Sequence, residues 1–210
     1  SRELAVRGIM MGEGEETFLK VVKQYMDGNL SFASVDGAAV RDERGNAVEN
    51  PLMKPVDLNL VPFFYKDLKG FKNRIIYYES SRGCPFACSY CLSSIDKSVR
   101  LRDTELVLKD LDFFLENKVP QVKFVDRTFN CNREHTRAVW NYILDHDNGV
   151  TNFHFEITAD LINEEELELL SRMRPGLVQL EIGVQSTNPD TIREIRRHMD
   201  LKRLKEVVER

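Results

Sequence analysis

From residue 75 onward, short apolar segments alternate with longer segments whose apolar residues recur every three or four positions. The short segments, near residues 75, 121, 152 and 177, have the length and composition of buried strands. The longer segments have the periodicity of amphipathic helices. Strands that alternate with helices of about 10–15 residues indicate βαβ units and a parallel sheet. The alternation therefore predicts an α/β fold with about four βα units, which is part of an α/β barrel.

Local signals place the starts of the helices between these strands. Asn163 is followed three residues later by Glu166, which predicts a capping box at the start of a helix. Asn188 precedes Pro189, and proline is favoured at the first position of a helix. Asn132 can cap the helix after the second strand. Each helix therefore has a start that is defined by its own residues.

The first 74 residues follow a different pattern. Residues 15–27 have the apolar rhythm of a helix, and residues 34–48 have the pattern of a β-hairpin with a Gly-Asn turn. Residues 49–74 contain three prolines and little periodicity, which is typical of a connector. We therefore predict an N-terminal domain over residues 1–50, a linker over 51–73, and the α/β domain over 74–210.

Three of the four cysteines follow the first predicted strand within eight residues, at Cys84, Cys88 and Cys91. Thiolate is the usual protein ligand of iron–sulfur clusters, so this loop can hold three irons of a cubane. A fourth iron would lack a protein ligand and could bind a substrate. The competing interpretation is a zinc site with Cys131 as the fourth ligand, because structural zinc needs four tetrahedral ligands.

Polar residues follow the other predicted strands where each one ends. They are residues 126–128, residues 156–160 and residues 181–186. Active sites of parallel α/β folds lie at the carboxyl ends of the strands. We therefore expect these residues to lie at the same edge of the sheet as the cysteines, where carboxylates, amides and hydroxyls can bind an amino group or a ribose.

The cysteine pattern, with Tyr90 before the last cysteine, resembles the C-x3-C-x-aromatic-C signature of radical S-adenosylmethionine (SAM) enzymes. Phe155-Glu156 and the segment Gly183-Val184-Gln185-Ser186 resemble SAM-contact motifs of one large subgroup. That subgroup includes cobalamin-dependent, methylthiotransferase and coproporphyrinogen-oxidase-like members. The resemblance covers residues 75 to about 200 and implies a partial (β/α) barrel of the radical SAM type.

The resemblance also implies a cofactor and a reaction. A [4Fe–4S] cluster would be held by Cys84, Cys88 and Cys91, and SAM would chelate its fourth iron. An electron would cleave SAM reductively and generate a 5′-deoxyadenosyl radical, which abstracts a substrate hydrogen. A reductant such as flavodoxin or ferredoxin would supply the electron. The substrate, a small molecule or a macromolecule, is not specified by these motifs.

The resemblance assigns the SAM contacts residue by residue. Tyr90 would lie near the adenine, Asp126 would bind the amino group, and Glu156 and Gln185 would bind the ribose or the carboxylate. Many family members carry a Gly-Gly-Glu-like motif after the second strand. This chain has Val125-Asp126-Arg127 there, so it departs from the family pattern at the expected amino-group ligand.

The N-terminal part carries a second resemblance. Gly12-Glu13-Gly14-Glu15, the helix, the hairpin and the proline-rich connector are similar to the end of a cobalamin-binding domain. That arrangement implies a small α+β remnant before the barrel and a cobalamin-dependent, methyltransferase-like parent protein. No Asp-x-His-x-x-Gly motif is present. The alternatives are a cobalamin-independent radical SAM enzyme and a zinc-stabilised, non-catalytic α/β module.

Charge and composition exclude other classes of protein. A net charge of −4 gives no basic nucleic-acid surface, and no apolar run reaches the ~18 residues of a membrane span. Four cysteines without a disulfide-like distribution favour a reducing, cytoplasmic location. The chain lacks an initiator methionine, so we expect a longer parent protein. We interpret the four histidines as structural or surface residues, and the basic run 193–198 as a solvated helix face.

Overall fold

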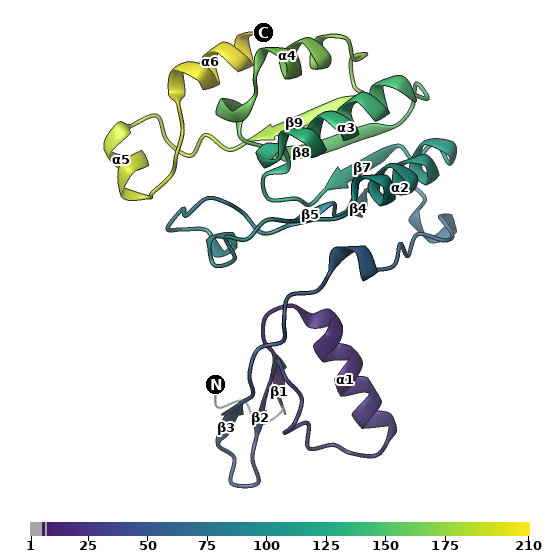
Figure 1. Ribbon diagram of the computed structural model, residues 1–210, viewed down its shortest axis with the longest axis vertical. Helices are drawn as coiled ribbons and strands as arrows, with labels where there is room; N and C mark the ends of the chain where they lie inside the picture. The colour runs from purple at the N-terminus through teal and green to yellow at the C-terminus, as the bar shows by residue number, and fades with distance from the viewer. Residues whose placement is uncertain (1–5, 7) are drawn as a thin grey trace. The chain divides into compact units, whose positions relative to one another are not determined.

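The computed structural model describes residue 6 and residues 8–210, and the chain divides into two compact units between Val61 and Pro62 (Figure 1). We refer to residues 1–61 as unit 1 and to residues 62–210 as unit 2. The elements of unit 1 are β1 (Gly8–Met10), α1 (Gly14–Met26), β2 (Ala38–Arg41), β3 (Ala47–Glu49) and the 3₁₀ turn η1 (Leu58–Leu60).

Unit 1 is an antiparallel sheet in the order β1-β2-β3 together with α1. The predicted hairpin is confirmed as β2 and β3. Thr17 of α1 is fully buried, and its hydroxyl donates a hydrogen bond to the carbonyl of Asp36 (3.2 Å). Gly37 has a φ of +79°, and an added Cβ there would lie 2.2 Å from Oγ1 of Thr17. A glycine is therefore required where β2 begins.

The predicted connector contributes to both units. The backbone N–H of Val56 donates to the carboxylate of Glu13 (2.7 Å) within unit 1. Phe63 and Tyr65 pack on the core of unit 2, and the Tyr65 hydroxyl donates to the carbonyl of Tyr77 (2.7 Å). The interpretation of the first 50 residues as a cobalamin-domain remnant, and of residues 51–73 as a linker, stays a prediction.

Unit 2 contains a four-stranded parallel sheet in the order β4-β7-β8-β9. Its strands are β4 (Ile76–Tyr78), β7 (Gln121–Phe124), β8 (Asn152–Ile157) and β9 (Val178–Ile182), and its helices are α2 (Thr104–Glu116), α3 (Arg133–Asp145), α4 (Glu164–Ser171), α5 (Pro189–Glu194) and α6 (Leu201–Glu209). Strands that neighbour one another in chain order, all parallel, form an arc of a (β/α) barrel. The α/β prediction and the four predicted strand positions are confirmed.

Side chains of alternate residues face opposite sides of this sheet. One side is apolar and packs on the helices, and Figure 1 shows α2 and α3 lying over it. Its buried residues include Val122, Phe124, Phe153, Phe155 and Ile157. The other side carries polar residues such as Lys123 and Glu156, which are only partly buried. The polar side of the sheet leads toward the cysteine loop.

The predicted helix starts are confirmed. The Asn163 side chain accepts a hydrogen bond from the Glu166 N–H, and the Glu166 side chain accepts one from the Asn163 N–H. Asn188 caps α5, which has proline in its first turn, and Asn132 caps α3. These caps satisfy N–H groups that have no partner within their helix.

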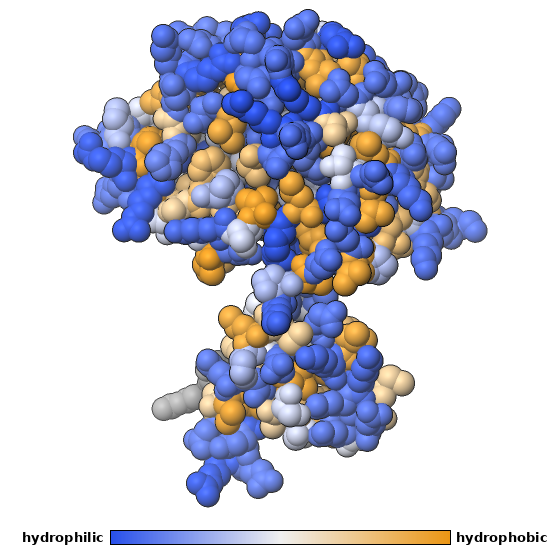
Figure 2. Space-filling view, viewed as in Figure 1, coloured by the Kyte–Doolittle hydropathy of each residue, from blue (hydrophilic) through white to orange (hydrophobic). Residues whose placement is uncertain are grey.

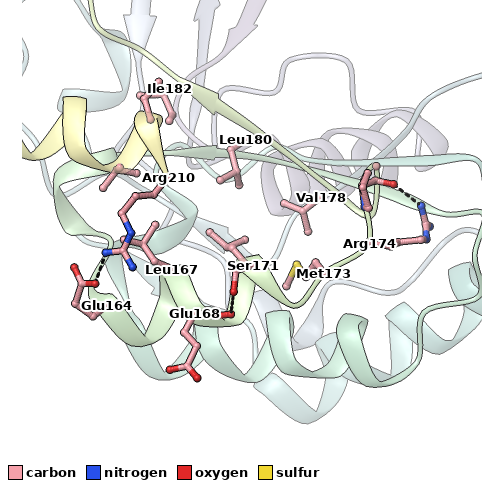
Figure 3. Close-up of a pocket in the computed structure, with 15 residues that line it drawn as sticks. Glu164, Leu167, Glu168, Ser171, Met173, Arg174, Val178, Leu180, Ile182 and Arg210 are labelled. Atoms are coloured by element: carbon pink, nitrogen blue, oxygen red, sulfur yellow. Dashed lines mark hydrogen bonds and ion pairs between the residues drawn. The ribbon is translucent and has the colours of Figure 1, made fainter.

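A groove of about 850 Å³ lies between α4, the edge strand β9 and α6 (Figure 3). Leu167, Met173, Val178 and Leu180 line it, and an ion pair between Arg210 and Glu164 lies at one end. Figure 2 shows hydrophilic residues over most of the visible face of unit 2, with hydrophobic residues in separate patches. Within the described part of the chain, no helix has the length and hydropathy needed to cross a membrane.

Candidate functional site

A cavity of about 230 Å³ lies at the carboxyl ends of the parallel strands in unit 2. Cys84, Cys88 and Cys91 line it together with residues at or just after the carboxyl ends of β7, β8 and β9. Those residues are Arg127, Thr128, Glu156, Ile157, Thr158, Glu181, Gly183 and Gln185. As expected from the sequence, the cysteines and the polar residues at the strand ends therefore lie around one cavity.

The cysteine loop leaves the sheet through a short antiparallel ladder of β5 (Ser81–Arg82) and β6 (Arg100–Leu101). Gly83 follows with a φ of +100°, and an added Cβ would lie 2.1 Å from the carbonyl oxygen of Ser98. The N–H of Cys84 then donates to the carbonyl of Asp96 (3.1 Å). Residues 96–101 thus close the loop, and only glycine fits at its entrance.

The three thiols of this loop together form a donor set that fits an iron–sulfur cluster. Cys84 and Cys88 are buried, Cys91 is partly buried, and the N–H of Cys91 donates to the carbonyl of Cys88 (3.2 Å). Among the described residues, no three His, Cys, Asp or Glu side chains converge closely enough for a single metal ion. Each cysteine ligand of a cubane cluster binds a different iron, whereas the ligands of zinc must meet at one ion. Thiols that are spread around one cavity therefore suit a cluster better than zinc.

The segment after β9 is shaped by two unusual backbone positions. Gln185 has a φ of +65°, in the left-handed region that non-glycine residues rarely adopt. An added Cβ at Gly183 would lie 2.7 Å from Nε2 of Gln185. Gly183 therefore leaves space for the Gln185 amide, and the strained conformation of Gln185 turns its side chain into the cavity.

Arg197 contributes a guanidinium to the cavity, which the sequence interpretation did not foresee. It donates hydrogen bonds to the carbonyl of Gly183 (2.5 Å) and to the hydroxyl of Tyr90 (3.3 Å). Among the described residues, its buried Nε has no hydrogen-bond partner. The interpretation of residues 193–198 as a solvated helix face is wrong here, because α5 ends at Glu194 and Arg196 takes a left-handed φ of +53°.

A network of charged side chains lies on the polar side of the sheet, next to the cavity. Nζ of Lys123 lies 3.0 Å from Glu181 and 3.4 Å from Glu156, and Nε2 of His154 lies 3.0 Å from Glu181. The hydrogen bond from Lys123 is the main cause of a lowered pKa at Glu181. Lys123 therefore joins the two carboxylates that line the cavity and keeps Glu181 ionised.

Asn130 fixes the backbone at the end of β8. Its side-chain amide donates to the carbonyl of Thr158 (2.9 Å) and accepts a hydrogen bond from the N–H of Thr158 (3.0 Å). Asn130 is buried, so this paired contact excludes water. Sequence reasoning missed Asn130, because nothing in its local pattern distinguishes it from a turn residue.

Asp126 is the one candidate residue that does not line the cavity. Its side chain is fully buried and accepts hydrogen bonds from the N–H and the hydroxyl of Ser80 (3.1 and 2.7 Å). Val122, Phe124 and Asp126 are each two positions apart, and side chains at this spacing face the same side of a sheet. The side chain of Asp126 therefore lies on the helix-covered side. The geometry therefore does not support the expected contact between Asp126 and a SAM amino group.

Comparisons with curated proteins give distant relatives. An anaerobic magnesium-protoporphyrin IX monomethyl ester cyclase from Synechocystis is 23% identical over 205 residues, which are 94% of this chain and 41% of that protein. An uncharacterized methyltransferase from Pyrococcus horikoshii is 28% identical over 143 residues, 61% of this chain and 30% of that protein. The chain thus spans less than half the length of these relatives.

Two solved structures share the fold. The radical SAM methyltransferase TsrM from Kitasatospora setae has a TM-score of 0.74 at 17% identity, over 97% of this chain and 43% of that one. The cobalamin-dependent SAM radical enzyme OxsB has a TM-score of 0.75 at 21% identity, over 96% of this chain and 31% of that one. Residues 78–210, more than half of the chain, match the Radical SAM superfamily, and the chain therefore belongs to that superfamily.

Proposed function

We propose that this chain carries the cluster-binding and SAM-binding part of a radical SAM enzyme. The observation that carries the proposal is that Cys84, Cys88 and Cys91 line one cavity together with Tyr90, Glu156 and Gln185. When bound at the three thiolates, a [4Fe–4S] cluster supplies the electron that cleaves SAM to methionine and a 5′-deoxyadenosyl radical. A reductant such as flavodoxin or ferredoxin supplies that electron to the cluster.

The lining of the cavity fits a zwitterionic amino acid that is joined to a nucleoside. Glu156 and Glu181 offer carboxylates, which accept hydrogen bonds from an ammonium group or from ribose hydroxyls. Arg127 and Arg197 offer guanidinium groups, which pair with a carboxylate. The Nε–H group of Arg197, which has no partner among the described residues, is available to donate to such a ligand.

Individual roles follow from the place of each side chain. Tyr90 is half-exposed at the rim, so its ring can pack on the adenine. Glu156, held by Lys123, binds the ribose or the amino group, and Gln185 binds the ribose or the carboxylate. Asp126 takes no part in binding SAM, because it is buried behind the strand ends.

Reductive cleavage of SAM is the direct test of this function. The chain is reconstituted anaerobically with iron and sulfide, reduced with dithionite, and incubated with SAM. We expect 5′-deoxyadenosine and methionine in equal amounts, at low turnover, and none with the Cys88→Ala variant. Release of 5′-deoxyadenosine at the same rate from Cys88→Ala, or its absence from a protein with an intact cluster that binds SAM, would refute the proposal.

Cobalamin-dependent methyl transfer is our proposal for the complete protein. The fold shared by both units with TsrM and OxsB favours it, since those structures cover nearly the whole chain. The relatives that are named as cyclases favour ring formation instead of methyl transfer. Titration of the full-length parent with hydroxocobalamin separates these classes from a cobalamin-independent enzyme, and absence of binding would exclude cobalamin-dependent methyl transfer.

A further inference from the structure

A chain of buried hydrogen bonds lies directly beneath the cysteine loop. Ser80 is fully buried at the point where the chain leaves β4 for the loop, four residues before Cys84. Its N–H and hydroxyl both donate to the carboxyl group of Asp126, at 3.1 and 2.7 Å. Two groups of one residue, Ser80, are thus attached to a single carboxyl group after β7.

His135 extends this chain. Its Nε2 lies 2.9 Å from the Ser80 hydroxyl oxygen, and the ring is buried. Because the Ser80 hydroxyl donates its proton to Asp126, His135 must donate to Ser80 through a protonated Nε2. Nδ1 of His135 then carries no proton, and it has no hydrogen-bond partner in the part of the chain that the structure describes. The order of donation is therefore His135 to Ser80 to Asp126.

Burial of the Asp126 carboxyl group destabilises the fold unless its hydrogen bonds are maintained. Asp126 is fully buried, and within the described part of the chain its carboxyl group is paired with the N–H and the hydroxyl of Ser80 and with no cation. A buried carboxyl group without a cation is destabilising unless hydrogen bonds compensate. The fold retains such a group at the base of the loop that carries three cysteines, and Thr128, two residues further on, lies 3.6 Å from the Cys84 sulfur.

We propose that Asp126, through Ser80 and His135, is a positioning residue for the cysteine loop. It holds the entrance of the loop so that Cys84 retains its iron, and it does not contact SAM. The inference rests on the proposed function, because it requires a cluster on Cys84, Cys88 and Cys91. It reassigns the acidic residue after β7 from cofactor recognition to the retention of the cluster.

Two substitutions test the proposal from different sides. Asp126→Asn keeps the shape of the side chain but leaves one acceptor oxygen for the two donors of Ser80, so the order of donation from His135 through Ser80 to residue 126 can no longer be kept. Ser80→Ala removes the hydroxyl that links Asp126 to His135 and leaves the backbone intact. Glu166→Gln is the matched control, because Glu166 is a buried carboxylate in the capping box of α4, away from the cysteine loop.

Iron release is measured after anaerobic reconstitution of each full-chain variant, by following the rate at which a ferrous chelator removes iron. Substitution of the residues that support metal ligands typically lowers metal affinity by about 10–100-fold. We therefore expect at least about tenfold faster iron release from Asp126→Asn and Ser80→Ala than from the wild type. Glu166→Gln should release iron at the wild-type rate, even where its apo-protein is less stable. The reduced cluster of Asp126→Asn should also show altered EPR g values.

SAM affinity separates this proposal from the expected role in binding the amino group. For the cluster-loaded fraction, we expect the Kd for SAM to be the same in Asp126→Asn and wild type. Wild-type iron release in Asp126→Asn, or weaker SAM binding with unchanged iron release, would overturn the inference. If Asp126→Asn does not fold, the release rate of Ser80→Ala decides. Failure of the wild-type protein to bind a cluster would instead refute the proposed function.

Discussion

Arg197 donates a hydrogen bond to the hydroxyl of Tyr90 (3.3 Å), although the two residues are 107 positions apart in the chain. The N–H of Ser89 donates to the carbonyl of Ile195 (2.9 Å) beside this contact. The segment between α5 and α6 therefore lies against the cysteine loop. Arg197 also contacts Gly183, so it links the loop to the strand end that carries Gln185.

Substitution of Arg197 should weaken SAM binding. Arg197→Gln removes the cation that lines the cavity and the links to Tyr90 and Gly183. Loss of a charged hydrogen bond typically costs about 1.5–3 kcal/mol, so we expect the Kd for SAM to rise about tenfold or more. Isothermal titration of the cluster-loaded protein measures it. Arg196→Gln is the control, and an equal effect of the two substitutions would contradict the assignment.

The entrance of the cysteine loop should tolerate no side chain at residue 83. Gly83→Ala places a methyl group 2.1 Å from the Ser98 carbonyl oxygen, so the loop must move. Gly149→Ala is matched in positive φ but has no atom within 4 Å of the added Cβ. We expect Gly149→Ala to cost only about 1–2 kcal/mol of stability and to retain iron. Gly83→Ala should lose stability and most of its iron. A normal iron content in this variant would contradict the clash between a side chain at residue 83 and the Ser98 carbonyl oxygen.

The stability of the apo-protein should depend on pH through two opposing groups. Burial raises the pKa of Asp126 to about 6, so its contribution to stability is lost as the pH rises from about 4 to 6. Burial lowers the pKa of His135 to about 4, so its contribution is lost as the pH falls from about 6.5 to 4. In the wild type, the two contributions largely cancel within this window.

Variants separate these two contributions. The free energy of unfolding of Asp126→Asn should rise between pH 4 and 6.5, because only the His135 contribution remains. That of His135→Gln should fall over the same range, by up to about 3 kcal/mol for a shift of about two pKa units. Urea denaturation at several pH values measures both. Parallel pH profiles for the two variants would contradict the buried states of these side chains.

The sheet could be predicted from the sequence because each strand and helix carries its own signal. Apolar runs mark β4, β7, β8 and β9, and the Asn163–Glu166 capping box marks the start of α4. The cysteine spacing identified the loop, and its place after the first strand put the loop at the carboxyl edge of the sheet. These features depend on local residues and on the general geometry of parallel sheets.

The differences between the sequence-based expectations and the structure have physical causes. Asp126 was placed at the rim because it follows a strand, yet its alternation with Val122 and Phe124 already indicated the buried side. Arg197 was missed because the polar pattern after Pro189 continues beyond the helix, while the backbone turns at Arg196. The contact between Arg197 and Tyr90 joins distant segments, and no local pattern encodes such a contact.

The most direct test of the central claim is the metal content of three proteins after anaerobic reconstitution with iron and sulfide. The wild type and Cys131→Ala should each bind about four iron and four sulfide per chain, and SAM should alter the EPR spectrum of the reduced cluster. Cys88→Ala should lose the cluster. Zinc in place of iron, or equal iron content in Cys88→Ala and Cys131→Ala, would contradict a cluster on Cys84, Cys88 and Cys91.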